Sequence, residues 1–208
     1  MPRKNIIGLL SISILIVIIL ATSCAKEGRH YSVSQEFKDY FLFQKGSFWI
    51  YKNDSTNVID SAYLTGSPQY TVLSTGEKRK SDPTTEQYFV DFQSQILSGY
   101  LILSGEDDNS LLIGVGPILN TWGIIDYLSP DTNFFINSAP QGYIKLWPKL
   151  PTIEINSIIF SNIIHTRFYN DNLNCNFYFA KNIGLIKISG YWENKNQSWS
   201  LLRYHIIQ

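Results

Sequence analysis

The chain has 208 residues, of which 44% are hydrophobic and 14% aromatic, and it carries 17 basic and 17 acidic side chains. This even balance gives no electrostatic footprint for DNA or RNA, so the composition argues against a nucleic-acid partner. Only 16% of the residues are charged, which is a low fraction for a soluble domain.

The first 24 residues contain the three parts of a secretory signal. Arg3 and Lys4 precede an apolar run over 6–20, and the small residues 21–23 lead directly to Cys24. A cysteine in this place resembles the lipobox of bacterial lipoproteins. The resemblance implies cleavage before Cys24 and lipidation of its thiol and new amino terminus. The alternative is an uncleaved membrane anchor, because the uncharged stretch is just long enough to span a bilayer. Both alternatives place the folded part outside the cytoplasm.

Removal of the signal, residues 1–23, leaves 185 residues, which suits one domain with a sizeable core. Residues 24–34 are expected to form a polar tether and residues 35–208 a β-rich domain. If Cys24 carries lipid, Cys175 is the one remaining thiol. Strand alternation places Cys175 on the same face as Phe177 and Phe179, so we expect a small buried hydrophobe there rather than a nucleophile.

The domain begins with one short helical pattern and continues as strands. Ser34 is a candidate N-cap for a helix that presents Phe37, Tyr40 and Phe41 on one face. Strands are then expected over 46–51, 58–64, 85–93, 100–103, 111–113 and 123–128. Residues 104–110 are expected to form a long acidic hairpin loop that shows no calcium-ligand spacing. Four prolines make 129–157 mostly loop, with one short strand over 143–147.

The last third gives the clearest strand pattern. We expect strands over 158–169, 173–180, 185–192 and 198–207, and connections this short join antiparallel neighbours. The predicted fold is therefore all-β, a single antiparallel, meander-like domain of about nine to eleven strands. A barrel or a strongly curved sheet is favoured because several strands are apolar on both faces. A β-sandwich is the alternative.

Two short motifs resemble uncharacterised β-rich lipoproteins of Bacteroidota. They are the opening Gly-Ser-Phe-Trp-Ile-Tyr over 46–51 and the closing segment 177–187. The resemblance implies the compartment and the fold class and brings no catalytic residues. Residues 25–27 resemble a signal for export to the cell surface. Ser55 and Ser61 lie in Asp-Ser patterns that resemble O-glycosylation sites of these bacteria, and turn or strand-start chemistry explains the same patterns.

Candidate sites of chemistry are few. His165 shares a strand face with Arg167 and Tyr169, where it lines either a polar cavity or a solvated surface. His205 shares a face with Arg203 and has the same interpretation. The sequence contains no His-Glu-x-x-His or Cys-x-x-Cys, so we expect no metal site. Gly-x-Ser-x-Gly and a phosphate-binding glycine loop are also absent.

The aromatic residues are the remaining candidates. Trp49, Trp192 and Trp199, together with His165, are candidates for a carbohydrate or lipid platform, and core packing is the alternative. Trp192 and Trp199 are also expected to meet across the last hairpin. We therefore expect a lipid-anchored envelope protein, on the outer membrane, without enzymatic activity or a cofactor. It would bind an apolar or glycan ligand or a partner protein. A structural subunit of an envelope complex and a hydrolase with a dispersed site are the alternatives.

Overall fold

The computed structural model describes residues 28–74, 76, 82–94, 99–106, 109–115, 123–126, 134–135, 143–169, 174–192 and 194–208. The signal segment, Cys24 and residues 25–27 lie outside this part of the chain. Packing divides the chain into two units, one of Met1–His30 with Ser74–Thr84 and one of Tyr31–Leu73 with Thr85–Gln208. In the first unit, the Thr84 amide donates to the Arg29 carbonyl, and the Thr84 hydroxyl hydrogen-bonds His30. Strand β1 (His30–Tyr31) spans the boundary.

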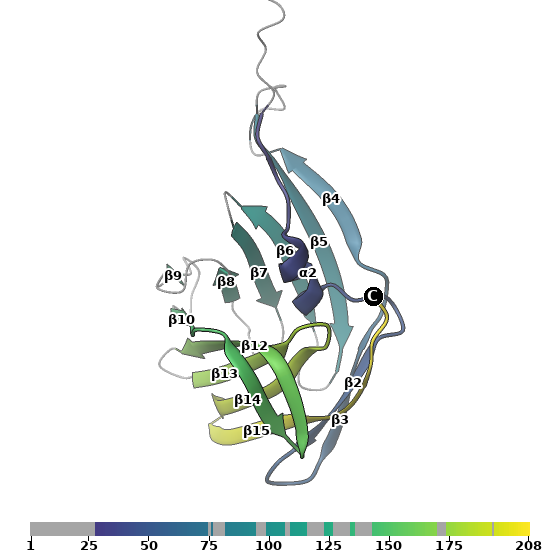
Figure 1. Cartoon of the computed structure of the whole chain (residues 1–208), viewed down its shortest axis with the longest axis vertical. Coiled ribbons are helices and arrows are strands. Elements are labelled where there is room, and N and C mark those ends of the chain that lie inside the picture. Colours follow the sequence, from purple (N-terminus) through teal and green to yellow (C-terminus); the bar gives the residue numbers. More distant parts are fainter. Residues whose placement is uncertain are drawn as a thin grey trace, which may run out of the picture. The chain divides into compact units, whose positions relative to one another are not determined.

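The second unit is all-β, as the sequence predicts, with one helix and one strongly curved, open sheet (Figure 1). The strands of the first half are β2 (Phe48–Asn53), β3 (Ile59–Leu64), β4 (Gln69–Ser74), β5 (Thr84–Gln93), β6 (Gly99–Glu106), β7 (Asn109–Val115) and β8 (Gly123–Asp126). Those of the second half are β9 (Phe134–Phe135), β10 (Tyr143–Leu146), β11 (Leu150–Ile155), β12 (Ile158–Tyr169), β13 (Asn174–Ala180), β14 (Gly184–Trp192) and β15 (Lys195–His205).

The sheet joins the two halves of the chain through its last strand. Its order is β8-β7-β6-β5-β3-β2-β15-β14-β13-β12-β10-β9, and β4 and β11 pair beside this path with β5 and β12. Strands β12 to β15 form the expected antiparallel meander. β15 then pairs antiparallel with β2, about 150 residues earlier, with Trp199 opposite Asn53 and His205 opposite Phe48. This long-range pairing makes one sheet out of two meanders.

The helix α2 (Gln35–Phe41) covers part of the inner face of the sheet. Ser34 is its N-cap, with the Phe37 amide donating to the Ser34 hydroxyl at 3.2 Å. Phe37, Tyr40 and Phe41 are buried, as the spacing predicts. The ring of Phe41 meets the ring of Phe179 on β13 edge-on, with centroids 5.0 Å apart. Each aromatic ring buried in this way contributes about 1.5–3 kcal/mol of hydrophobic free energy.

A hairpin that the sequence pattern did not predict covers another part of the same face. β11 lies in a region expected to be mostly loop, yet it pairs with β12 from Leu150 opposite Ile163 to Ile155 opposite Ile158. Pro151, the proline within β11, is tolerated because β11 has β12 as its one partner among the described strands, and an edge strand can lack one amide. The turn residues Asn156 and Ser157 have positive φ, which is the signature of a two-residue hairpin turn. Figure 1 shows this hairpin crossing β13 to β15, and the Asn156 side chain donates to the Leu201 carbonyl.

The strand β12 changes partners at a bend. Its first residues pair with β11, and from Ile163 onward it pairs with β13. Asn162, at the junction, has a φ of 53°, a left-handed conformation that asparagine tolerates well. The Asn162 carbonyl accepts hydrogen bonds from the Tyr40 hydroxyl and the Lys181 amide. These bonds fix the bend against α2 and the β13–β14 turn.

One further expectation needs correction, and one strand was not anticipated. The acidic loop expected over 104–110 is shorter, because β6 and β7 stay paired out to Glu106 opposite Asn109. β4 was not predicted, although it pairs with β5. Apolar side chains on both faces of β4 are exposed, among them Tyr70, Val72 and Leu73. A strand with so little buried surface shows no clean alternation that sequence reasoning can detect.

Candidate functional site

The outer face of β12 and β13 carries a patterned set of half-buried polar and aromatic side chains. Along both strands these residues alternate with buried apolar ones. The register sets His165 opposite Tyr178, Arg167 opposite Asn176 and Tyr169 opposite Asn174. Residues directly opposite one another have Cβ atoms about 5 Å apart, so the members of each pair are neighbours on this face. His165 thus lies on a surface shared with Arg167 and Tyr169, in agreement with the sequence analysis.

Three rings form a parallel stack on this face, which we call the His165 stack: Trp147, His165 and Tyr178. The His165 and Tyr178 rings have centroids 4.3 Å apart and planes within 8°. Trp147 follows β10, donates its amide to the His165 carbonyl, and lies 5.7 Å from the His165 ring with planes within 6°. Parallel rings in contact are about 3.5–4 Å apart. The indole is therefore displaced sideways from His165, and Trp147 is 37% exposed.

Hydrogen bonds hold the polar neighbours of the stack in place. The His165 Nε2 atom lies 3.0 Å from the Asn176 Oδ1 atom. Arg167 donates its Nε–H to the Asn174 Oδ1 atom at 2.8 Å, and its guanidinium lies 5.4 Å from the centre of the Tyr169 ring. Burial lowers the pKa of His165, the Asn176 bond raises it, the Arg167 charge lowers it, and the net shift is downward. The imidazole is therefore neutral at pH 7, which suits stacking between two aromatic rings.

The same outer face continues over β14 and β15. Lys187 lies opposite Tyr178 on one side and opposite Ser200 on the other. The Asp54 carboxylate accepts hydrogen bonds from Ser198 and Ser200 and lies 4.0 Å from the Lys187 ammonium. Lys187 thus has an acidic partner, whereas no carboxylate pairs with Arg167 among the residues that the structure describes.

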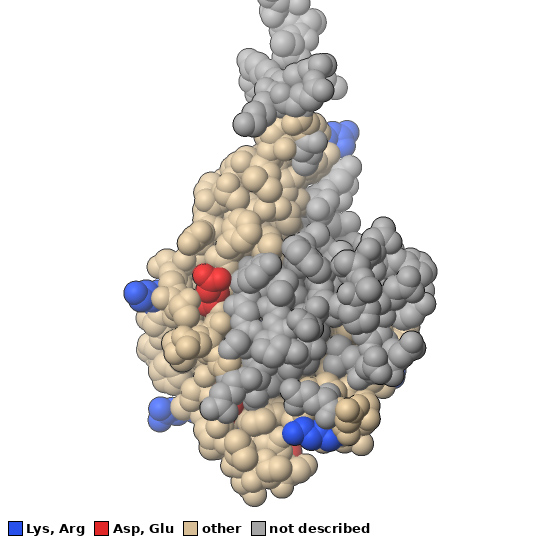
Figure 2. Space-filling view, turned by 180° about the vertical axis from the view of Figure 1, so that it is seen from behind, with Lys and Arg blue, Asp and Glu red and all other residues tan. Residues whose placement is uncertain are grey.

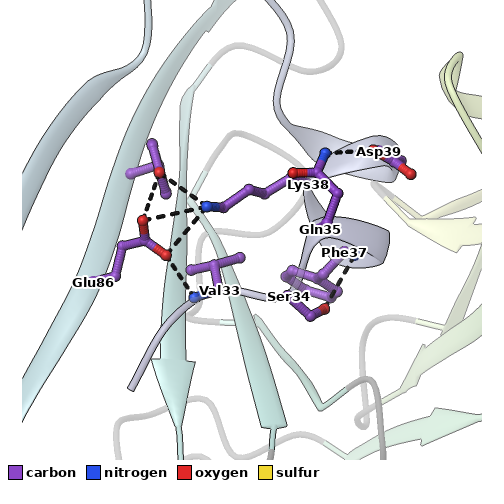
Figure 3. A network of polar contacts seen from close by, with 8 residues as sticks. Val33, Ser34, Gln35, Phe37, Lys38, Asp39 and Glu86 are labelled. Atoms are coloured by element: carbon purple, nitrogen blue, oxygen red, sulfur yellow. Dashed lines mark hydrogen bonds and ion pairs between the residues drawn. The ribbon is translucent and has the colours of Figure 1, made fainter. Parts of the chain in front are cut away.

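A second polar cluster ties α2 to the sheet (Figure 3). In this cluster, the Lys38 network, the Glu86 carboxylate accepts bonds from the Val33 amide, the Lys38 ammonium and the Tyr88 hydroxyl. The Lys38 ammonium also donates to the Tyr88 oxygen at 3.0 Å. Burial alone would raise the pKa of Glu86, but these hydrogen bonds and the Lys38 charge together lower it. Every group here is satisfied within the fold, so the cluster supports structure rather than ligand binding.

The tryptophans proposed as ligand contacts lie in the core. Trp49 and Trp192 are each 2% exposed and Trp199 is 7% exposed. The Trp49 indole donates to the Ile183 carbonyl and meets the Phe43 ring edge-on. Trp192 and Trp199 do not meet across the last hairpin, since their partners are Lys195 and Ile188 respectively. This is the packing alternative, and it leaves these indoles no exposed ring face for a surface ligand.

The other residues singled out in the sequence occupy three different environments. Cys175 is fully buried opposite Gly190, as its alternation predicts, and burial raises the pKa of its thiol to about 12. Ser55 lies in the β2–β3 turn and Ser61 on the outer face of β3, and both are exposed. Exposure is compatible with glycosylation, which stays a prediction. Cys24 lies outside the described residues, and its lipidation also stays a prediction.

Sequence reasoning did not select Trp147, Tyr178 or Arg167 as site residues. A signal for Tyr178 was present, because the alternation that buries Cys175 places Tyr178 with Asn174 and Asn176 on the opposite face. Trp147 gave no such signal, since its contact with His165 depends on the pairing of β10 with β12. Within the described residues there is no cluster of three metal-ligating side chains, and no helix there is long and apolar enough to cross a membrane.

Comparisons with known proteins find only distant similarity. No family model and no curated protein matches the chain. One solved structure that aligns with it is a "putative exported protein with YmcC-like fold" from Bacteroides fragilis NCTC 9343, and another is a "putative lipoprotein" from Parabacteroides distasonis ATCC 8503. Each is 13% identical to this chain, with a TM-score of 0.40. Each alignment covers 80% of this chain, and it covers 98% of the first solved chain and 99% of the second. The function therefore has to be argued from the residues of this chain.

Proposed function

We propose that the protein is a lipid-anchored envelope protein that binds a saccharide on the outer face of β12 and β13, at the His165 stack. The observation that carries this proposal is the indole of Trp147, which is displaced sideways from the His165 ring and 37% exposed. Sugars present C–H groups on one face of the ring and hydroxyls around its edge. They bind where an exposed aromatic surface lies beside fixed hydrogen-bonding groups.

The stack supplies both requirements. His165 and Tyr178 lie on paired strands, and the Trp147 backbone is hydrogen-bonded to His165, so Trp147 loses little conformational freedom when a ligand binds. Asn174, Asn176 and Arg167 lie beside it, with Asn176 hydrogen-bonded to His165 and Arg167 donating to Asn174. On the inner face, α2 packs its Phe41 ring on Phe179, and the β11–β12 hairpin crosses β13 to β15. We therefore propose the saccharide site on the outside of the sheet.

We propose binding without catalysis. The Nε2 atom of His165 is engaged by an amide oxygen rather than by a carboxylate, and the lowered pKa of His165 comes from burial between rings. A hydrolytic site would bring together a base, its orienting acid and a nucleophile. The residues described around His165 are aromatic, amide and guanidinium groups instead.

The test is affinity electrophoresis of the full chain, solubilised in mild detergent, through gels that contain single polysaccharides. Trp147→Ala should weaken binding of the retarding polysaccharide by about ten-fold, the value expected for loss of one aromatic contact and its buried area. Tyr70→Ala is the matched control, because it removes an exposed ring from β4, outside the site. Equal retardation of the two variants, or no retardation by any polysaccharide, would contradict the proposal.

The anchor is tested separately by metabolic labelling with a palmitate analogue. Wild-type chain should incorporate the label and fractionate with membranes, whereas Cys24→Ala should do neither. An unlabelled wild-type chain would show that the amino-terminal segment is not processed as a lipoprotein signal.

A second candidate function, a subunit of an envelope complex, is favoured by exposed aliphatic side chains at two hairpins. Val58 and Ile59 at the β2–β3 hairpin are 51% and 49% exposed, and Ile158 and Ile159 at the β11–β12 hairpin are 41% and 71% exposed. Such side chains are typical of protein contacts when they lie together. Cross-linking in intact cells, compared between wild type and Ile159→Lys, tests this function; an unchanged cross-linking pattern would exclude a contact at Ile159.

A further inference from the structure

The proposed saccharide site lies beside a second cluster of aromatic and cationic residues on the same outer face. We call it the Phe48 cluster: Phe48, Tyr63, Arg203 and His205. Backbone register sets Phe48 opposite Tyr63 on one side and opposite His205 on the other. The rings of Phe48 and His205 are stacked with centroids 5.7 Å apart, and the Arg203 guanidinium lies 5.7 Å from the Phe48 ring centre.

The two clusters contain the same combination of residue types. Each combines a histidine stacked on an aromatic ring with an arginine whose guanidinium lies over a ring. Arg167 lies over Tyr169 beside the His165 stack, and Arg203 lies over Phe48. Neither arginine has a carboxylate partner in the part of the chain that the structure describes. A guanidinium held over a ring keeps N–H groups available for an incoming anion, and its planar fork fits a carboxylate.

The local charge also favours an anion. The described charged side chains on the outer face of β12 to β15 and β2 include Arg167, Lys187, Arg203 and Lys52. Asp54 is the acid next to them, and it is bound by two serines and lies near Lys187. Figure 2 shows that charged side chains are few and well separated on the face seen from behind.

The spacing of the clusters indicates the length of the ligand. Arg167, Asn176, Ser189 and Ser198 lie opposite one another across β12 to β15. This row covers about 15 Å across the sheet, and Arg203 lies about 15 Å further along β15. A single sugar cannot reach both arginines, whereas an oligosaccharide can.

We propose that the saccharide is anionic and extended, a chain of acidic sugars whose carboxylates reach Arg167 and Arg203 while its ring faces pack on aromatic side chains. This proposal rests on the proposed function at Trp147 and adds the charge and length of the ligand. The outer face then works as one surface with two anion contacts. The two arginines select for an acidic saccharide, and the aromatic rings supply the stacking contacts with the sugar rings.

The experiment compares oligogalacturonides with their fully methyl-esterified forms, which keep the sugar rings and remove the charge. Binding is measured by calorimetry on the full chain in detergent at 0.05 and 0.15 M salt. The free acid of eight residues should bind at least about ten-fold more tightly than its ester, the difference expected for charge-assisted hydrogen bonds. Arg167→Gln should weaken binding of the acid much more than binding of the ester, and so remove most of that preference.

The length of the oligosaccharide distinguishes the contribution of Arg167 from that of Arg203. Arg203→Gln should weaken binding of the eight-residue acid and should not affect a two-residue acid that occupies the Trp147 site alone. Lys195→Gln, an exposed lysine on the same strand, is the matched control for loss of one positive charge. If the control weakens binding as much as Arg203→Gln, the effect is general charge and the second contact is refuted.

Each result decides between the two proposals. If acid and ester bind equally and both need Trp147, the proposed function stands and the anionic preference is overturned. If neither binds, and no other polysaccharide does, the saccharide function itself fails. Polyglutamate tests charge without sugar rings, and binding of polyglutamate as tight as that of the acid would overturn the proposal of a saccharide ligand.

Discussion

Substitution of Glu86 by glutamine tests how much the Lys38 network stabilises the packing of α2 on the sheet. The side chains of Lys38 and Glu86 are only 18% and 11% exposed. One carboxylate oxygen of Glu86 accepts from the Val33 amide at 2.7 Å, and the other accepts from the Tyr88 hydroxyl at 2.7 Å and from Lys38 at 3.2 Å. A glutamine has a single acceptor oxygen, so its NH₂ group must face one of these donors.

The expected loss follows from the bonds that remain. One hydrogen bond to a charged group is lost and the others lose their charge assistance, at about 1.5–3 kcal/mol for a bond of this kind. We therefore expect Glu86→Gln to lower the free energy of unfolding by about 2–3 kcal/mol. For a chain of this size the melting temperature should fall by about 5–10 °C.

Urea unfolding at pH 7, followed by tryptophan fluorescence, measures the effect. The matched control is Glu36→Gln, because Glu36 pairs with Lys149 at 2.6 Å while the two side chains are 47% and 46% exposed. Exposed pairs contribute about 0–1 kcal/mol, so the control should change little. Equal losses in the two variants would refute the claim that burial makes the Lys38 network strong.

The pH dependence of the same variant gives a second check. The folded state lowers the pKa of Glu86 below its ordinary value of 4.5. The unfolded chain therefore takes up this proton first as the pH falls, and the stabilisation is complete above about 4.5 and disappears as the pH falls through the folded-state pKa. Wild type and Glu86→Gln should approach each other in stability toward pH 3. A constant difference over the whole range would contradict the assignment of the effect to the charged carboxylate.

Three further predictions concern the outer and inner faces of β12 to β14. Because the folded state lowers the pKa of His165 below 6.5, the unfolded state binds that proton first, so the stability advantage of wild type over His165→Gln should shrink as the pH falls below about 6.5; an advantage that grows toward pH 5 would show the opposite sign. The Cys175 thiol, buried with its pKa raised to about 12, should resist iodoacetamide at pH 8 in the folded chain and react in 6 M guanidinium chloride; rapid labelling of the folded chain would contradict its burial. Gly190→Ala should destabilise the fold by more than about 3 kcal/mol, because Gly190 has a φ of 150° and an added Cβ would lie 1.9 Å from the Asn174 carbonyl oxygen; a thermal melt within 2 °C of wild type would refute this.

The sequence predicted the elements that depend on residues close together along the chain. The cap and apolar spacing of α2 were readable because Ser34 and three aromatic residues lie within one helical turn or two. β12 was predicted from Ile158 to Tyr169 as observed, since alternation and short turns act over neighbouring residues. The burial of Cys175 followed from the same alternation. Each of these features depends on residues a few positions apart.

The missed features depend on contacts between distant segments. β11 was hidden by prolines that an edge strand tolerates, and whether a strand lies at an edge depends on which partner it finds. Trp199 was expected beside Trp192, but the register of β14 and β15 puts it opposite Ile188. The acidic segment between β6 and β7 was expected to be a long loop because consecutive charged residues are typical of loops. The backbone pairing of β6 with β7, which extends both strands into this segment, leaves no such sign in the sequence.

The sequence by itself determined the amino-terminal signal pattern, the all-β class and the inward face of the clearly alternating strands such as β12 and β13, because these depend on composition and on a two-residue period. Only the tertiary structure decided that Trp49, Trp192 and Trp199 are core residues, that Trp147 lies against His165, and that Arg203 shares a surface with Arg167. The physical reason is that ring stacking and charge neighbourhoods depend on register between strands. That register is set by pairings such as β2 with β15, whose partners are far apart along the chain.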